Sequence, residues 1–202
     1  MFSFKIQSYF LIISIFLPGF LKAQTTGIGQ WQDYLPYNHC IAVVQGGTRI
    51  YCATPYSLFY VDKSDNSINR LNKVTGLSDV DVSGISYSDT YNTLVIAYAN
   101  ANIDLVKNDE VINIPDIKRK QILGNKTINS ITVIDKYAYL ACGFGIVVLD
   151  IDREEIHDTW YIGPDGDQIN VNAVTFAFDK YFYAATEKGI FYADASTNLA
   201  YY

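Results

Sequence analysis

An internal repeat constrains the fold of this chain more than any other feature of its sequence. Four segments rich in apolar and aromatic residues can be laid over one another without gaps. Each carries an alanine at the same position, and these alanines are Ala53, Ala97, Ala141 and Ala185, each 44 residues after the one before. Four-stranded propeller blades repeat at about 40–45 residues. The period therefore predicts an array of such units.

Each repeat is predicted to hold four antiparallel strands, A to D. An apolar segment precedes each alanine-bearing segment and is joined to it by a polar or glycine turn, which is the pattern of a β-hairpin. The predicted A strands are 41–44, 82–87, 128–134 and 171–178. The inner strands are apolar on both faces, and no long amphipathic helical segment separates them. These features predict an all-β fold, a β-propeller with four-stranded blades of about 44 residues.

The two ends of the repeat region leave two alternatives for the ring. The segment 31–35, WQDYL, stands where a D strand would precede the first repeat, and the chain stops at Tyr202 inside the fourth repeat. Either this strand completes a closed four-bladed ring, or about four blades are present from a larger ring. We expect the second arrangement, with a propeller domain over 24–202 that is truncated at its C-terminal side.

The first 23 residues have the pattern of a secretory signal peptide. Lys5 supplies the positive charge, 9–21 is an apolar stretch, and Ala23 is a small residue before a cleavage point. No other stretch is long and apolar enough to span a bilayer. We therefore expect an exported protein of the periplasm or outer-membrane surface, without a membrane span in the mature chain.

The charge balance argues against nucleic acid as a partner. The chain has 15 Lys and Arg against 21 Asp and Glu, which gives a net charge of −6. Nucleic-acid binding requires clustered cations. The basic run 118–120, with Lys126 nearby, is either a solvated loop or a patch for phosphate or an anionic glycan.

Three cysteines are too few for a disulfide scaffold. Cys40 and Cys52 flank the predicted turn QGGT, so they could form a cross-strand bridge in an oxidising compartment. Small buried thiols are the interpretation that the sequence favours for them, as for Cys142. The sequence leaves these alternatives open.

Few residues are suited to catalysis or to holding a cofactor. The chain has two histidines, and most acidic residues fall in predicted turns, where Asp bonds its own backbone. The segment 163–170, GPDGDQIN, lacks the further ligands of a calcium loop. Gly143 and Gly145 lack the third glycine and the following helix of a phosphate-binding loop. We expect no enzyme activity, no cofactor and no metal site.

In a propeller, the loops at one rim bind partners while the strands form the scaffold. The B–C loops and the D–A connections of this chain are predicted to open on the same rim. Their ligand-facing side chains are predicted to be Tyr56, Asn100, Asn102, Phe144 and Lys188. Aromatic and amide groups suit contact with a glycan or a peptide, and ordinary loop packing would also explain them.

Several segments, in order, resemble the N-terminal propeller of the PorZ-type proteins of the Bacteroidetes type IX secretion system. They are WQDYLPY, GLSDVDVSGISY, LVIAYANANIDLV, IPDIKRK, INSI, AYLACGFGIVVLDIDREEIHDTWYIG and AATEKGIFYA. The resemblance implies a longer, non-enzymatic protein with two propellers and a C-terminal sorting domain. It also implies a place at the outer membrane beside the sortase, in the complex that attaches cargo to anionic lipopolysaccharide.

The periplasmic sensor propeller of a hybrid two-component regulator, binding a glycan or another small ligand, is an alternative. Its repeats also carry GLS before a short strand, but they usually show an inner strand like LWIGT. This chain has LVIAY, YLACG and YAATE instead, which favours the secretion-system scaffold.

Overall fold

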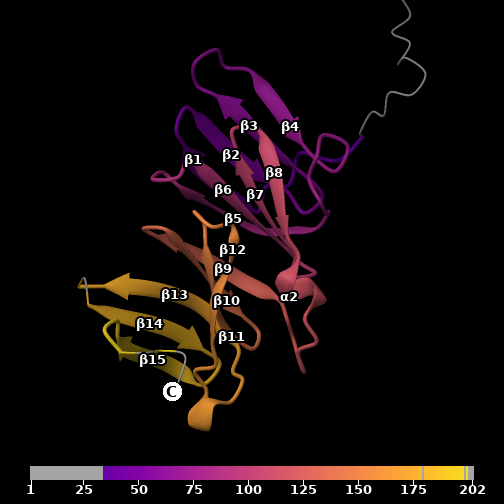
Figure 1. The fold of residues 1–202 in the computed structure, drawn as a ribbon. Coiled ribbons are helices and arrows are strands. Elements are labelled where there is room, and N and C mark those ends of the chain that lie inside the picture. Colours follow the sequence, from indigo (N-terminus) through magenta and orange to yellow (C-terminus); the bar gives the residue numbers. More distant parts are fainter. Residues whose placement is uncertain (1–33, 179, 198, 200–202) are drawn as a thin grey trace, which may run out of the picture. The chain divides into compact units, whose positions relative to one another are not determined.

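The computed structural model describes residues 34–178, 180–197 and 199, which form four antiparallel sheets in chain order (Figure 1). The first sheet holds β1 (Ala42–Gly46), β2 (Arg49–Ala53), β3 (Leu58–Asp62) and β4 (Ile68–Leu71). The second holds β5 (Val82–Ser88), β6 (Thr93–Tyr98), β7 (Ile103–Lys107) and β8 (Glu110–Ile114). The third holds β9 (Ile128–Ile134), β10 (Tyr137–Cys142), β11 (Gly145–Asp150) and β12 (Glu155–Trp160). The fourth holds β13 (Val171–Ala177), β14 (Tyr181–Thr186) and β15 (Gly189–Asp194).

The sheets confirm the predicted fold class. Each is a meander in which every strand pairs with the next one along the chain, and the observed A strands differ from the predicted ones by at most two residues at either end. Helical structure in the described residues is confined to α2 (Asp116–Arg119) and a single 3₁₀ turn at Pro164–Gly166. Of the predicted strand at 31–35, residues 31–33 lie outside the described residues, and Tyr34 and Leu35 are not in a strand.

The inner strands of the second and third sheets are apolar on both faces because each one is packed between two neighbouring sheets. On β6, Leu94 and Ile96 belong to a core shared with the first sheet, whereas Val95 belongs to a core shared with the third sheet. On β10, Leu140 faces the second sheet and Tyr139 faces the fourth. Side chains of a strand alternate between its faces, so both sets are removed from water. This is the packing expected of neighbouring propeller blades.

The repeated alanines lie where one sheet approaches the next. Ala53, Ala97 and Ala141 are fully buried, each on the face turned to the following sheet. Ala185, at the same position of the fourth sheet, is exposed. A small residue permits two sheets to approach closely, so alanine is required where the following sheet packs against this position.

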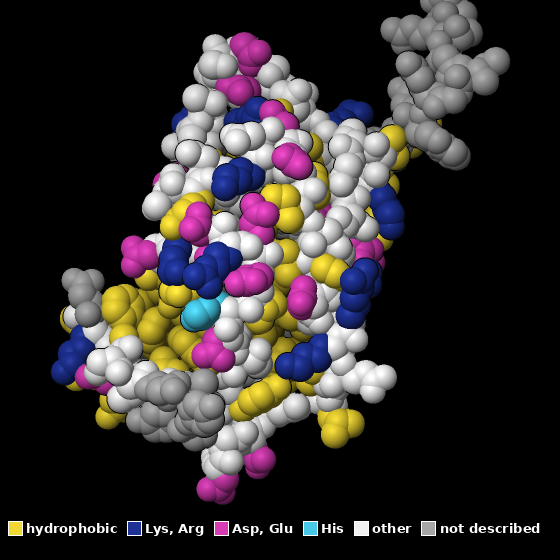
Figure 2. Space-filling model, viewed as in Figure 1, with side chains coloured by type: hydrophobic (Ala, Val, Ile, Leu, Met, Phe, Trp, Pro, Cys, Tyr) yellow, Lys and Arg dark blue, Asp and Glu magenta, His cyan; other side chains and the backbone are white. Residues whose placement is uncertain are grey.

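Apolar surface is exposed on the first and fourth sheets. Val43 is 66% exposed on β1, and Ile190 and Tyr192 are 75% and 71% exposed on β15. Figure 2 shows hydrophobic side chains gathered at the surface over β13. A groove of about 410 Å³, lined by residues that include Trp160, Phe182 and Leu199, lies between the third and fourth sheets.

Acidic and amide residues in the turns adopt left-handed backbone conformations, as turn chemistry predicts. Asn92 and Asp135 have φ of 48° and 51° in the turns that join the A and B strands. Asp165 has φ of 59° in the segment considered for calcium, and this segment forms the 3₁₀ turn. The backbone geometry of the turns therefore explains why Asn and Asp occur at these positions.

We expect Ala141→Leu to lower the free energy of unfolding by about 1–3 kcal/mol, because the larger side chain would overpack the contact between the third and fourth sheets. The matched variant Ala185→Leu, at the exposed equivalent position, should change it by less than about 0.5 kcal/mol. Urea denaturation followed by tyrosine and tryptophan fluorescence measures both. Equal losses from the two substitutions would contradict the account of the alanine positions.

Candidate functional site

The B–C loops and the D–A connections meet at one rim, as predicted. Each D–A connection is held to a B–C loop by a backbone hydrogen bond of 2.8–3.1 Å between an N–H and a carbonyl oxygen. The pairs, donor first, are Val82 with Pro55, Ala99 with Asp81, Gly143 with Thr127, and Glu187 with Asn170. The bond from Val82 to Pro55 joins the second sheet to the first, and the other three tie a D–A connection to the B–C loop of the sheet that it leads into.

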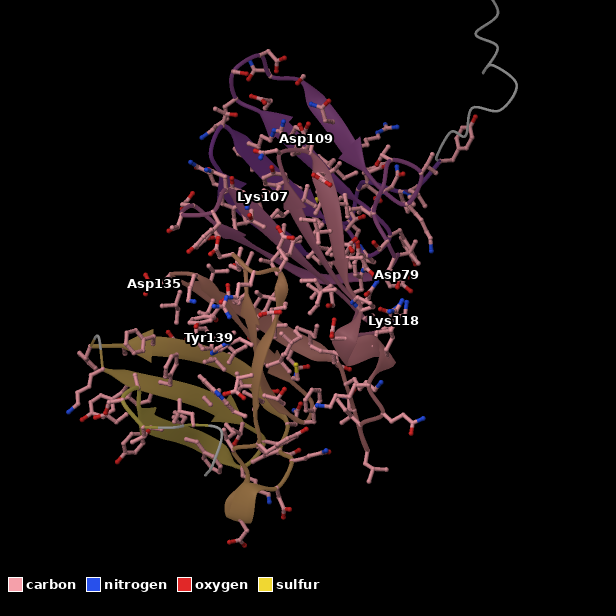
Figure 3. The ribbon with its side chains drawn as sticks, in the orientation of Figure 1. Asp79, Lys107, Asp109, Lys118, Asp135 and Tyr139 are labelled. Atoms are coloured by element: carbon pink, nitrogen blue, oxygen red, sulfur yellow. The ribbon has the colours of Figure 1, made fainter. Side chains whose placement is uncertain are left out.

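Asp79 organises the part of the rim above the second sheet. Its Oδ2 accepts hydrogen bonds from Asn100 Nδ2 at 2.6 Å, Asn102 Nδ2 at 3.3 Å and Lys118 Nζ at 2.6 Å. Figure 3 shows Asp79 and Lys118 close together where the sheet meets α2. Burial alone would raise the pKa of Asp79, but the hydrogen bonds from Lys118 and Asn100 outweigh it and hold the pKa at about 2.

A second carboxylate lies beneath Asp79 and is fully buried. Asp104 Oδ2 accepts hydrogen bonds from the Ser78 backbone N–H at 2.8 Å and from the Tyr98 hydroxyl at 2.6 Å. Its Oδ1 accepts one from Asn113 Nδ2 at 2.9 Å. Burial, together with the bond to Asp104, raises the pKa of Tyr98, so this hydroxyl remains a donor.

Asn113 joins the two carboxylate sites, because its Nδ2 also donates to Asn102 Oδ1 at 3.0 Å. The resulting network fixes the 76–79 segment to the B–C loop of the second sheet. Sequence reasoning missed this network. The available signal was Asp104 itself, an acidic residue inside the apolar strand IDLV.

The basic run beside this network is partly occupied by structural contacts. Lys126 Nζ donates to the carbonyl oxygens of Ile117, Lys118 and Lys120 at 3.2, 2.9 and 2.5 Å, which satisfies acceptors at the end of α2. Lys118 is paired with Asp79. Arg119 and Lys120 are exposed, and Figure 2 shows basic side chains on this side of the molecule. These two residues are the cations that the run offers to a partner.

A polar pocket of about 390 Å³ lies at the rim between the third and fourth sheets. Its lining residues are Asn125, Asn129, Gly143, Gln168, Ile169, Asn170 and Glu187. Asn129 Nδ2 donates to Asn170 Oδ1 at 2.9 Å and to the Val171 carbonyl oxygen at 2.6 Å. Side-chain amides both donate and accept hydrogen bonds, so this lining suits the hydroxyl groups of a sugar or the backbone of a peptide.

Three of the five predicted ligand-facing residues are exposed at the rim. Tyr56 is 51% exposed, and Asn100 and Lys188 are also exposed. Asn100 already donates to Asp79. A binding role for these three residues stays a prediction.

Asn102 and Phe144 are 2% and 1% exposed, so the expectation that they face a ligand is wrong. The Asn102 amide is occupied by the carboxylate network. The Phe144 ring turns into the core between the second and third sheets, with its centroid 6.3 Å from that of Tyr161. Neither side chain reaches the solvent side of its loop.

Other candidate chemistry at the CGFG loop has structural explanations. Burial raises the pKa of Cys142 to about 12, and its thiol donates to the Leu140 carbonyl oxygen at 3.4 Å. Gly145 has φ of 149°, and a Cβ there would lie 2.3 Å from the Trp160 carbonyl oxygen. The glycine is required by close backbone approach.

Two further properties concern only the part of the chain that the structure describes. No group of three or more His, Cys, Asp or Glu side chains in it could hold a metal ion. None of its helices combines the length and apolar character needed to cross a membrane.

The meander sheets, the packing of neighbouring sheets and the shared loop rim define a β-propeller domain. The model of the PorZ N-terminal β-propeller domain, a domain of the type IX secretion system, matches residues 50–202. The chain belongs to this family.

Two solved structures are similar to this one. PorZ of Porphyromonas gingivalis, described as an essential bacterial surface component of the type IX secretion system, is 29% identical with a TM-score of 0.76. The match covers 85% of this chain and 23% of that chain, so this chain spans less than a quarter of that PorZ.

The extracellular domain of a putative hybrid two-component system from B. thetaiotaomicron is 18% identical with a TM-score of 0.55. That match covers 81% of this chain and 21% of the other. At this identity the likeness shows the fold alone. No curated protein matches the chain.

We expect the stability of the protein to fall as the pH drops from about 4 to about 2. The Asp79 carboxylate has a lowered pKa of about 2 in the folded state, so its contribution is complete above its ordinary pKa of about 3.9 and is lost as the pH falls through the folded value. Asp79→Asn should unfold at a lower temperature at neutral pH and show a shallower decline below pH 4. Thermal unfolding across this pH range measures both effects.

Asp167→Asn is the control for this experiment, because it removes an exposed carboxylate from the same rim. It should keep the unfolding temperature of the unmodified protein at neutral pH. Superimposable pH profiles for Asp79→Asn and the unmodified protein would show that the Asp79 contacts do not stabilise the fold.

Proposed function

We propose that this chain is a non-enzymatic binding propeller of the type IX secretion attachment complex at the outer-membrane cell surface, where it acts with the sortase. The family match over residues 50–202 is the observation that carries this proposal. The similarity to a PorZ described as a bacterial surface component supports the location. The signal-peptide pattern of residues 1–23 supports export.

The rim is the surface proposed for partner binding. Above the second sheet, the Asp79 and Asp104 networks fix the loops of the rim, so their exposed groups are presented in a defined arrangement. A preorganised surface loses less conformational entropy when a partner binds. A non-enzymatic binding role requires only exposed groups that are held in a defined arrangement.

Arg119 and Lys120 are the groups proposed to contact anionic lipopolysaccharide. Both are exposed, and neighbouring Lys118 and Lys126 are held by contacts of their own. The chain has a net charge of −6, so attraction of an anionic glycan depends on this local cluster. Such contacts weaken as salt concentration rises.

We expect the double variant Arg119→Glu with Lys120→Glu to bind immobilised anionic lipopolysaccharide at least about tenfold more weakly, because two cationic donors are replaced by repelling charges. Biolayer interferometry at low and moderate salt measures the affinity. The matched control, Lys63→Glu with Arg153→Glu, makes the same change in net charge at exposed turns away from the B–C loops. Equal loss in both variants would show a general charge effect instead of a site.

Tyr56 and Lys188 are the exposed rim residues proposed to contact the sortase. We expect Tyr56→Ala with Lys188→Ala to weaken sortase binding by roughly tenfold, since tyrosine is a frequent source of interface energy and loss of the lysine removes a charged hydrogen-bond donor. The control is Phe178→Ala with Lys63→Ala, which removes an exposed aromatic ring and a lysine from turns at the other end of the strands. Surface plasmon resonance with purified sortase compares them, and an unchanged affinity in the rim variant would place the contact elsewhere.

The extracellular domain of the hybrid two-component system shares only its fold with this chain, at 18% identity. The gene distinguishes the two functions. A kinase and a transmembrane helix encoded in the same reading frame would contradict the secretion proposal, and a C-terminal sorting domain would support it.

A further inference from the structure

Two cysteines of the first sheet occupy positions that the repeat defines in every sheet. Cys52 lies on β2 directly before Ala53, and Cys40 lies two residues before Ala42, the register partner of Ala53. The same register places three other residue pairs at these positions in the second, third and fourth sheets. They are Val82 with Ile96, Ile128 with Leu140, and Val171 with Ala184.

In each equivalent pair, the two side chains lie on the same face of the sheet. Each pair belongs to a single buried apolar cluster, and none of its side chains is more than 5% exposed. In the first sheet both positions hold cysteine, with Cys40 exposed and Cys52 half-buried. Burial raises the pKa of the Cys52 thiol, and the Cys40 thiol raises it further.

We propose that Cys40 and Cys52 form a disulfide bond that closes the β1–β2 hairpin. The proposal rests on the proposed function only for an oxidising location, because disulfides persist outside the cytoplasm. Cys40 precedes the ladder of β1, so its backbone can adjust to the spacing that a disulfide requires.

The reaction removes two protons and two electrons from the two thiols, and its oxidant is another disulfide, such as that of oxidised glutathione or of a thiol oxidoreductase. Exposed Cys40 reacts first as the thiolate, attacks one sulfur of the oxidant and releases one thiol. The Cys52 thiolate then attacks the Cys40 sulfur of the mixed disulfide and releases the second thiol. The oxidant is thereby reduced to two thiols, and one S–S bond is formed in the protein.

The experiment uses the purified full chain, reduced and then exposed to oxidised glutathione. Trypsin cuts after Arg49, between the two cysteines, so the disulfide joins two peptides in a non-reduced digest. We expect this linked pair by mass spectrometry, and an unfolding temperature roughly 5–10 °C above that of the reduced chain. Cys40→Ser should abolish both, and Cys142 should remain a free thiol because it is fully buried.

Two free, alkylatable thiols after oxidation, glutathione retained on Cys40, or dimers linked through Cys40 would each overturn the disulfide. These results do not depend on export, so they leave the proposed function intact. Protein isolated from cells under thiol-trapping conditions gives the second measurement. A disulfide that forms in the purified chain but is absent from that protein would support the chemistry and count against the proposed location.

Discussion

The fold depends on one constraint, which is that the inner strands of the second and third sheets are each packed between two neighbouring sheets. Alternate side chains of β6 and β10 enter different cores, so neither strand has a face left for water. The same constraint explains why the first and fourth sheets expose apolar residues such as Val43 and Ile190. In the described residues, each of these sheets has a neighbour on one face alone. The strands of these two sheets nevertheless carry apolar residues on both faces, as strands packed between two sheets do.

The rim is held by a different kind of interaction. Asp79 and Asp104 are surrounded by donors from the 76–79 segment, the B–C loop and the D strand of one repeat. A buried carboxylate is costly unless its oxygens are satisfied, and here each accepts at least one hydrogen bond. Polar contacts of this kind are directional, so they fix loops that apolar packing cannot reach.

The sequence period was sufficient to predict the sheets, their strand order and the rim at which loops gather. It was insufficient to predict where a loop side chain points. Phe144 follows a buried strand and turns back into the core, and Asn102 bonds Asp79 and Asn113, which come from other segments. These orientations arise from contacts between segments far apart in sequence. The polar pocket at Asn129 and Gln168 was missed for the same reason, because its walls come from two sheets.

Comparison between repeats gives information that a single repeat lacks. The position of Cys52 holds Ile96, Leu140 and Ala184 in the other sheets, and each of these is buried with the partner that stands where Cys40 stands. A thiol at one of these positions would be an ordinary small core residue. Thiols at both positions, on a face that no other sheet covers in the described residues, place two reactive groups together at the surface. Comparison of the repeats thus distinguishes residues that packing between sheets requires from the pair Cys40 and Cys52, which such packing does not explain.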